Sequence, residues 1–156
     1  GYRVEIISIR DGMDPIPIRM ESEGIIKIIS ILNALIQAFG NFSICLVIDE
    51  LDAGIFEYML GELLDIFSKS AKGQLIFTSH NLRALEMLDK DSIMLSTANP
   101  DRRYIRMKNV KATNNQRDMY LRGITLGGQD EVIYEETDSL KIARAFRKAG
   151  RMIQHE

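Results

Sequence analysis

The sequence has few of the residues that build disulfides and metal centres. Among its 156 residues there is one cysteine, Cys45, which excludes an internal disulfide and a zinc site made of several cysteines. The two histidines, His80 and His155, are too few for a histidine-rich metal centre. The rest of the composition, 46% hydrophobic and 27% charged, is typical of a globular protein, and the length suits one domain with a buried core.

An excess of charge of one sign and a long apolar run are also missing. Twenty basic and 22 acidic side chains leave a net charge of −2, so nucleic acid would have to bind at a local basic patch. The most apolar segment, 25–39, has 15 residues and includes Lys27, whereas a membrane span needs about 20 apolar residues. The chain also opens without the basic and apolar regions of a signal peptide. We therefore expect a cytoplasmic protein without membrane contact and a buried helix at 25–39.

Hydrophobic periodicity predicts that strands and helices alternate along the chain. Apolar residues at spacings of three and four predict helices at 23–38, capped by Ser22, and at 55–70. The unbroken apolar run 44–48 is typical of a strand covered on both faces of a parallel sheet, which makes Cys45 a small core residue. The other expected elements are strands at 2–9 and 74–78, an extended segment at 16–20, helices at 82–88, 116–121 and 138–150, a hairpin of 92–97 with 104–107, and a loop at 123–128.

This order of elements predicts the fold class. Strands that alternate with helices long enough to cross over favour an α/β fold with right-handed connections. We expect a partly parallel sheet flanked by helices, followed by a hairpin and a C-terminal helix. In open sheets of this kind, functional residues lie at the carboxyl ends of the strands.

Two of the expected strands end in ionisable side chains. Asp49 and Glu50 follow the apolar strand 44–48, which is the Walker B arrangement. An aspartate at such a strand tip can hold a Mg²⁺ ion that bridges nucleotide phosphates, and the adjacent glutamate can orient or deprotonate an attacking water. His80 follows the second strand and could bond to a γ-phosphate. The alternatives are two carboxylates that cap the next helix and a surface histidine.

A third polar segment, Ser22-Glu23-Gly24, lies just before the first long helix. Backbone N–H groups and a serine hydroxyl at a helix N-terminus make an anion site. An ordinary helix cap explains the same residues.

These segments together resemble the C-terminal half of an ABC-type ATPase head. The order is Ser22-x-Gly24, then the strand ending in Asp49-Glu50, then Leu51-Asp52-Ala53-Gly54, then Thr78-Ser79-His80. It is most similar to the RecF, SMC and overcoming-lysogenization-defect branch, and within it to bacterial ATPases linked to phage defence. The resemblance covers about residues 19–81 and extends to Gly128, where 119–123 is similar to a Tyr-Leu-x-Gly element. The signature departs from the usual Leu-Ser-Gly-Gly-Gln, since Glu23 replaces its first glycine.

The resemblance implies a three-layer P-loop NTPase-like fold and a role for each motif residue. Asp49 would be the Mg²⁺ partner, Glu50 the catalytic carboxylate and His80 the γ-phosphate sensor. Ser22 and Gly24 would touch the γ-phosphate of ATP held by a second head, and Asp52 would lie at the interface of the head dimer. The implied activity is ATP hydrolysis in DNA maintenance or phage defence, with a nuclease or effector as a candidate partner.

A phosphate-binding loop of the form Gly-x-x-x-x-Gly-Lys-Ser/Thr is absent from the sequence. Because this loop supplies the phosphate cradle and its lysine, the chain alone should bind ATP poorly and be inactive. We expect that a Walker A lobe precedes Gly1 in a longer protein; a natural split or a pseudo-ATPase is the alternative. Residues 1–128 would then form the C-terminal lobe of the head and residues 129–156 a helical extension.

Two other functions and one other partner remain open at this point. A Toprim-like metal-dependent nuclease would use the acids of Asp49-Glu50-Leu51-Asp52, although no separate Glu-Gly pair follows another strand. A non-catalytic interaction module would retain only the fold. DNA is a candidate partner, because 101–125 holds seven basic residues and 141–151 holds five without an acid, although such stretches are more often solvated faces.

Overall fold

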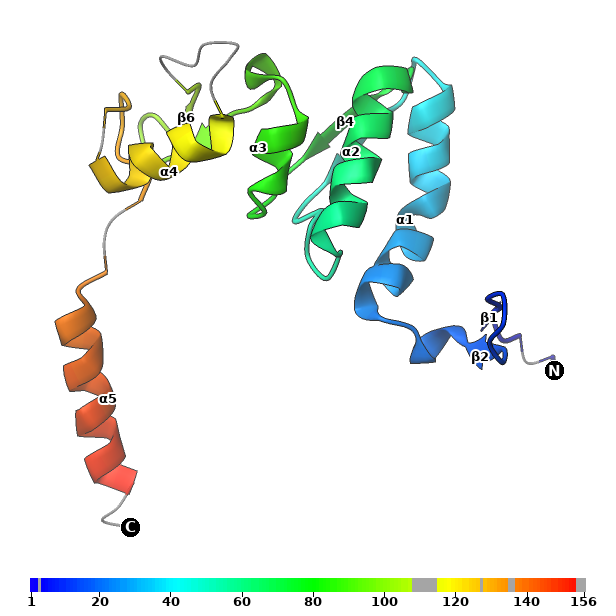
Figure 1. The fold of residues 1–156 in the computed structure, drawn as a ribbon, viewed down its shortest axis with the longest axis horizontal. Helices are drawn as coiled ribbons and strands as arrows, with labels where there is room; N and C mark the ends of the chain where they lie inside the picture. The colour runs from blue at the N-terminus through cyan, green and yellow to red at the C-terminus, as the bar shows by residue number, and fades with distance from the viewer. Residues whose placement is uncertain (3, 108–114, 127, 135–136, 154–156) are drawn as a thin grey trace. The chain divides into compact units, whose positions relative to one another are not determined.

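The computed structural model describes residues 1–2, 4–107, 115–126, 128–134 and 137–153. The protein is a mixed α/β structure, with small two-stranded sheets and five α-helices among these residues (Figure 1). It divides into two compact units, Gly1–Ile93 with Asn115–Arg117 and Met94–Asn114 with Asp118–Glu156. The division predicted from motifs, 1–128 and 129–156, concerns a lobe and its extension and stays a prediction.

The N-terminal strands are shorter than the sequence predicts. β1 (Ile7–Ser8) pairs antiparallel with β2 (Ile16–Pro17), and the chain turns between them at Gly12, where φ is +75°. The predicted strand 2–9 and extended segment 16–20 are therefore wrong in length. The reason is that the chain enters a 3₁₀ turn at Ile18–Met20 directly after β2, so only two residues can pair on each side.

The first long helix, α1 (Glu23–Gly40), begins at the predicted residue and runs two residues further than predicted. Ser22 is its N-cap, and the Ser22 Oγ accepts a hydrogen bond from the Ile25 N–H at 3.4 Å. The helix packs against β3 (Cys45–Ile48) and β4 (Gln74–Phe77) and buries Gly24, Leu35 and Ala38. By length and hydropathy alone α1 could cross a membrane, a test that core helices also pass. The predicted burial holds on one side only, since Ile26, Ile29, Leu32 and Ile36 are exposed.

β3 and β4 form a parallel pair that is joined by α2 (Glu57–Ser70), as the sequence predicts. Side chains alternate between half-buried and exposed along both strands. Val47 is 69% exposed and Ile76 48%, and Cys45 is exposed on the same side. The predictions that this strand is covered on both faces and that Cys45 is a core residue are therefore wrong for the chain by itself.

The reason is that the helices of this unit cover one face of the β3–β4 pair. The core consists of Leu51, Ile55, Leu60 and Leu64, and inward side chains of α1, β3, β4 and α3 (Arg83–Met87) pack against it. Figure 1 shows α2 between α1 and α3. Among the described residues of this unit, no second layer covers Val47 and Ile76; we call the surface formed by Cys45, Val47 and Ile76 the open face.

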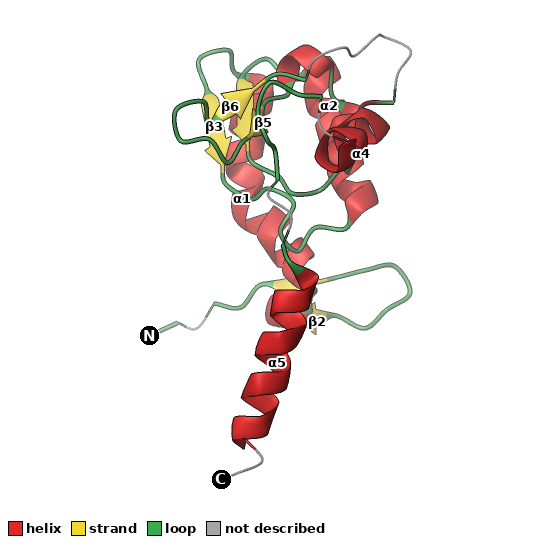
Figure 2. Cartoon of the chain, turned by 90° about the vertical axis from the view of Figure 1, so that its left-hand side faces the viewer, coloured by secondary structure: helices red, strands yellow, loops and turns green. Residues whose placement is uncertain are grey.

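The second unit begins with the predicted hairpin. β5 (Leu95–Ser96) pairs antiparallel with β6 (Tyr104–Ile105). α4 (Gln116–Leu126), whose first two residues belong to the first unit, is longer than predicted and takes in most of the expected loop 123–128. α5 (Ser139–Ile153) is one unbroken helix and confirms the predicted C-terminal helix (Figure 2). The α/β class is thus confirmed, in the form of three separate small sheets among the described residues.

Candidate functional site

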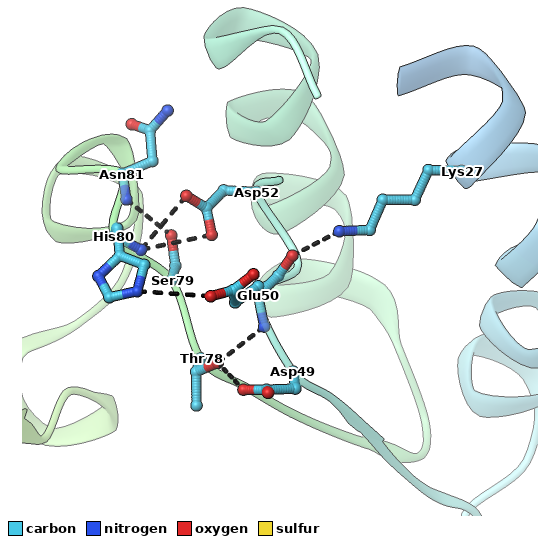
Figure 3. A network of polar contacts seen from close by, with 8 residues as sticks. All are labelled: Lys27, Asp49, Glu50, Asp52, Thr78, Ser79, His80 and Asn81. Atoms are coloured by element: carbon cyan, nitrogen blue, oxygen red, sulfur yellow. Dashed lines mark hydrogen bonds and ion pairs between the residues drawn. The ribbon is translucent and has the colours of Figure 1, made fainter. Parts of the chain in front are cut away.

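The parallel pairing of β3 and β4 brings the two predicted strand ends together (Figure 3). The register pairs Ile48 with Phe77, so Asp49 and Thr78 come next on neighbouring strands. Thr78 Oγ1 donates to Asp49 Oδ1 at 2.5 Å and accepts from the Glu50 N–H at 2.7 Å. The Leu51 N–H donates to the Thr78 carbonyl oxygen at 3.0 Å. One threonine hydroxyl therefore fixes the carboxylate of Asp49 and the backbone of Glu50 at the same time.

The carboxylate of Glu50 lies beside the imidazole of His80. The distance from Glu50 Oε1 to His80 Nε2 is 3.8 Å, and the two side chains are 59% and 86% exposed. Both groups thus face solvent at the carboxyl edge of the strand pair, where a ligand can reach them without any rearrangement of the core. Of the predicted site residues, these two and Asp49 are the ones that the structure gathers around an accessible point.

Asp52 has a different position. Its two carboxylate oxygens accept hydrogen bonds from the His80 N–H at 3.3 and 3.2 Å. The loop after β3 is therefore tied to the loop after β4 through this carboxylate. Asp52 orients the backbone from which the His80 imidazole projects.

Glu50 has an unusual backbone. Its φ of +48° is the only positive value at a non-glycine among the described residues. The Lys27 ammonium donates to the carbonyl oxygen of Glu50 (Figure 3). It also donates, at 3.2 Å, to the carbonyl oxygen of Ala53. Since left-handed backbone is rarely adopted by residues with a side chain and clusters at functional sites, Glu50 is marked out independently of its motif.

The structure places the two signature residues at the start of α1, beside the loop after β3. Ser22 is exposed, whereas Gly24 is buried against the Gly54 carbonyl. A Cβ built on Gly24 would lie 2.2 Å from the Gly54 carbonyl oxygen, so only glycine fits. Gly24 therefore serves the contact between the helix and the loop, and Ser22 is the residue of this pair that an incoming ligand can reach.

The acids at this edge suit only one kind of metal binding. Among the described residues, no group of three or more His, Cys, Asp or Glu side chains gathers as a ready-made metal site, and His155 lies outside the description. Mg²⁺ is commonly held by one or two carboxylates together with substrate phosphates and waters. The exposed carboxylate of Asp49, oriented by Thr78, fits that mode and does not fit an all-protein cage.

Sequence reasoning names Thr78 only as part of the segment Thr78-Ser79-His80 and gives no role to Thr78 or Lys27. Thr78 could have been found from the strand register, because it is the residue opposite Asp49 at the strand ends. Lys27 stands out in the sequence only as a charge in the apolar segment 25–39. Its isolation there was a signal that it has a polar partner, but the partner, a backbone carbonyl 23 residues further on, cannot be read from the pattern.

Comparisons with known proteins add no family. No protein-family model matches the chain, and no curated protein matches it. The fold and the site therefore define a mixed α/β protein with a solvent-facing cluster of carboxylates, a histidine and a threonine at the carboxyl ends of a parallel strand pair.

Proposed function

We propose that the chain is the C-terminal lobe of an ABC-type ATPase head of the RecF, SMC and overcoming-lysogenization-defect kind, with a P-loop NTPase fold completed by an N-terminal Walker A lobe. The observation that carries this proposal is the convergence of Asp49, Glu50 and His80 at the ends of adjacent parallel strands. Motifs 30 residues apart in the sequence meet there as a phosphate-cleaving site requires.

In the proposed reaction, water attacks the γ-phosphate of ATP in line with the leaving group. Glu50 orients this water and accepts its proton, and His80, 3.8 Å away, bonds to the γ-phosphate. Asp49 would hold Mg²⁺, which would supply charge stabilisation to the phosphate oxygens. Thr78 fixes the orientation of the Asp49 carboxylate by a hydrogen bond.

The partners in this proposal follow from surfaces of the first unit. An N-terminal lobe would pack on the open face, which carries the apolar pattern of a strand buried on both sides. A second head would meet the exposed Ser22 at the start of α1, with Asp52 near the interface and Gly24 shaping the contact from within. The same proposal includes a cytoplasmic location and a nuclease or effector as a further partner.

DNA contact is proposed for α5. Five basic residues and no acid lie in this helix, and all five are exposed: Lys141, Arg144, Arg147, Lys148 and Arg151. Their spacings of three and four place them on one side, opposite Ile142 and Phe146. A cationic helix side of this kind suits a row of phosphates. Of the seven basic residues at 101–125, Lys108 and Lys111 lie outside the described residues.

The nuclease alternative receives less support. A Toprim-like site needs acids from two strands to hold its metal, whereas the strand end of β4 offers Thr78, Ser79 and His80. Mn²⁺-dependent nicking of DNA that is lost in Asp49→Ala would favour it. If the chain is instead a non-catalytic interaction module, we expect no ATPase activity in any longer protein that contains it.

The proposal is tested first by the gene sequence upstream of the chain and then by one substitution. A Walker A motif upstream in the same gene supports the proposal. In that full-length protein, Glu50→Gln should lower kcat for ATP by about 100-fold or more while ATP binding persists. Glu62→Gln, at an exposed carboxylate of α2, is the matched control. Wild-type turnover in Glu50→Gln contradicts the role of Glu50.

A further inference from the structure

We infer that Lys27 and Thr78 are positioning residues that hold the backbone of Glu50 in its left-handed conformation and thereby direct its carboxylate toward His80. The inference begins with φ of Glu50, +48°. A residue with a Cβ pays a conformational cost there and keeps the conformation only when the surroundings enforce it. The contacts around Glu50 identify what enforces it.

The two peptide groups that flank Glu50 are each held by a side chain. On the amide side, the Glu50 N–H donates to Thr78 Oγ1 at 2.7 Å. On the carbonyl side, the Glu50 oxygen accepts from the Lys27 ammonium and from the Ala53 N–H, the latter at 3.0 Å. Because both flanking groups are fixed, rotation about φ and ψ of Glu50 would break at least one of these bonds.

Lys27 is suited to this task by its charge and by its isolation. It is the only basic residue in α1, and an ammonium has three donors, two of which reach the carbonyls of Glu50 and Ala53. The flanking residues Ile26 and Ile28 have no polar groups that could replace it. Loss of the ammonium therefore leaves the carbonyl side of the turn without a side-chain donor.

Thr78 works from the neighbouring strand. Its hydroxyl donates to Asp49 and accepts from Glu50, so its direction is set by the strand pairing. Lys27 reaches the same turn from α1. The conformation of Glu50, in the loop after β3, thus depends on contacts from α1 and from the end of β4, which are far apart in the sequence. A change in either positioning residue should alter the direction of the Glu50 carboxylate.

The conformational part is tested in the chain itself. Backbone chemical shifts and scalar couplings of Glu50, measured by NMR, report its φ. Lys27→Met and Thr78→Val should move them away from left-handed values, and Lys27→Arg and Thr78→Ser should restore them, because they retain a donor or the hydroxyl. Lys69→Met, which removes an ammonium paired with Asp65 on α2, is the control. Unchanged Glu50 signals in Lys27→Met overturn the inference.

The catalytic part rests on the proposed function and is tested in the full-length protein. Lys27→Met should lower kcat about tenfold or more with KM for ATP nearly unchanged, because the direction of Glu50 matters for attack and not for binding. Thr78→Val should lower kcat as well and can also raise KM, since the same hydroxyl holds Asp49. A raised KM with unchanged kcat contradicts positioning and points to direct nucleotide contact. If wild-type protein hydrolyses no ATP while Lys27→Met still moves the Glu50 signals, the proposed function fails and the backbone assignment stands.

Discussion

At the scale of single residues, Gly24 shows how closely α1 approaches the loop after β3. A methyl group at this position would lie 2.2 Å from the Gly54 carbonyl oxygen, and this backbone atom cannot move aside by a change of rotamer. Gly24→Ala should therefore destabilise the chain by about 1–3 kcal/mol, measured by urea unfolding.

Gly40, at the other end of the same helix, is the matched control. A Cβ there meets nothing within 4 Å, and its φ is not positive. Gly40→Ala should leave the stability unchanged or raise it by about 0.5 kcal/mol, since alanine is the better helix former. Equal effects of the two substitutions would show that the close approach at Gly24 does not limit stability.

Glu86 gives the protein a pH-dependent contribution to stability. The guanidinium groups of Arg117, at 2.9 Å, and Arg83, at 2.6 Å, hold the pKa of its carboxyl below the ordinary value of 4.5. Because the unfolded chain binds the proton more readily, this contribution is complete above about pH 4.5 and is lost as the pH falls through the lowered folded-state pKa.

Glu86→Gln tests this contribution. The variant should be less stable than wild type at about pH 7, and the difference should shrink as the pH falls below about 4.5 and through the lowered pKa of the folded-state carboxyl, because the wild-type side chain then becomes neutral like glutamine. Urea midpoints across this range measure the difference. A difference that is independent of pH would mean that the two arginines stabilise the carboxyl by packing alone. Glu62→Gln, at an exposed glutamate on α2, is the control.

The residues of the candidate site fall into two groups: those that a short stretch of sequence predicts, and those that depend on a contact between distant parts of the chain. Asp49, Glu50 and His80 could be predicted because each lies within three residues after an apolar strand, and parallel pairing then brings strand ends together. Lys27 and the left-handed backbone of Glu50 could not, because both depend on a contact between α1 and a loop 23 residues away. The burial of Gly24 is missed for the same reason.

At the scale of elements, prediction succeeds where periodicity is strong and long. α1, α2, β3 and β4 lie where the sequence places them, within two residues or fewer at each end. The short strands β1 and β2 depend on a partner and not on their own pattern, so their lengths are missed. α4 continues through Gly123, which the sequence suggests as a loop start, because that glycine is buried and packs near Gln129.

The basic side of α5 leads to a prediction about salt. Removal of two cations, Arg144→Gln with Lys148→Gln, should weaken binding to duplex DNA and reduce the slope of log K against log salt by about 2. Lys69→Gln with Lys72→Gln on the first unit makes the same change in net charge and is the control. Equal losses in the two variants would mean that only net charge matters, and α5 would then have no special role.

At the scale of the whole molecule, the first unit has helices on one face of its parallel strands and an open face on the other. The sequence predicts two-sided cover because it encodes apolar side chains on both sides of the strand. The pattern of the strand alone does not show whether the rest of the chain covers both faces. In this chain the helices cover one face, and Cys45, Val47 and Ile76 on the other face are exposed.

This difference can be measured with a pair of neighbouring residues. Val47→Lys, on the open face, should change the unfolding free energy of the chain by less than about 0.5 kcal/mol, whereas Ile48→Lys, which faces the core, should cost about 3 kcal/mol or more. In a protein that includes the proposed N-terminal lobe, Val47→Lys should become as damaging as Ile48→Lys. A harmless Val47→Lys in that longer protein contradicts the proposed packing.

The lone cysteine gives this face a chemical reporter. Cys45 lies exposed beside Val47, and no other thiol in the chain competes with it. Alkylation by a maleimide should therefore label one position, quickly when the strand is bare and slowly once another layer shields it. The rate of that single reaction therefore measures how far the open face is covered under any condition that is tested.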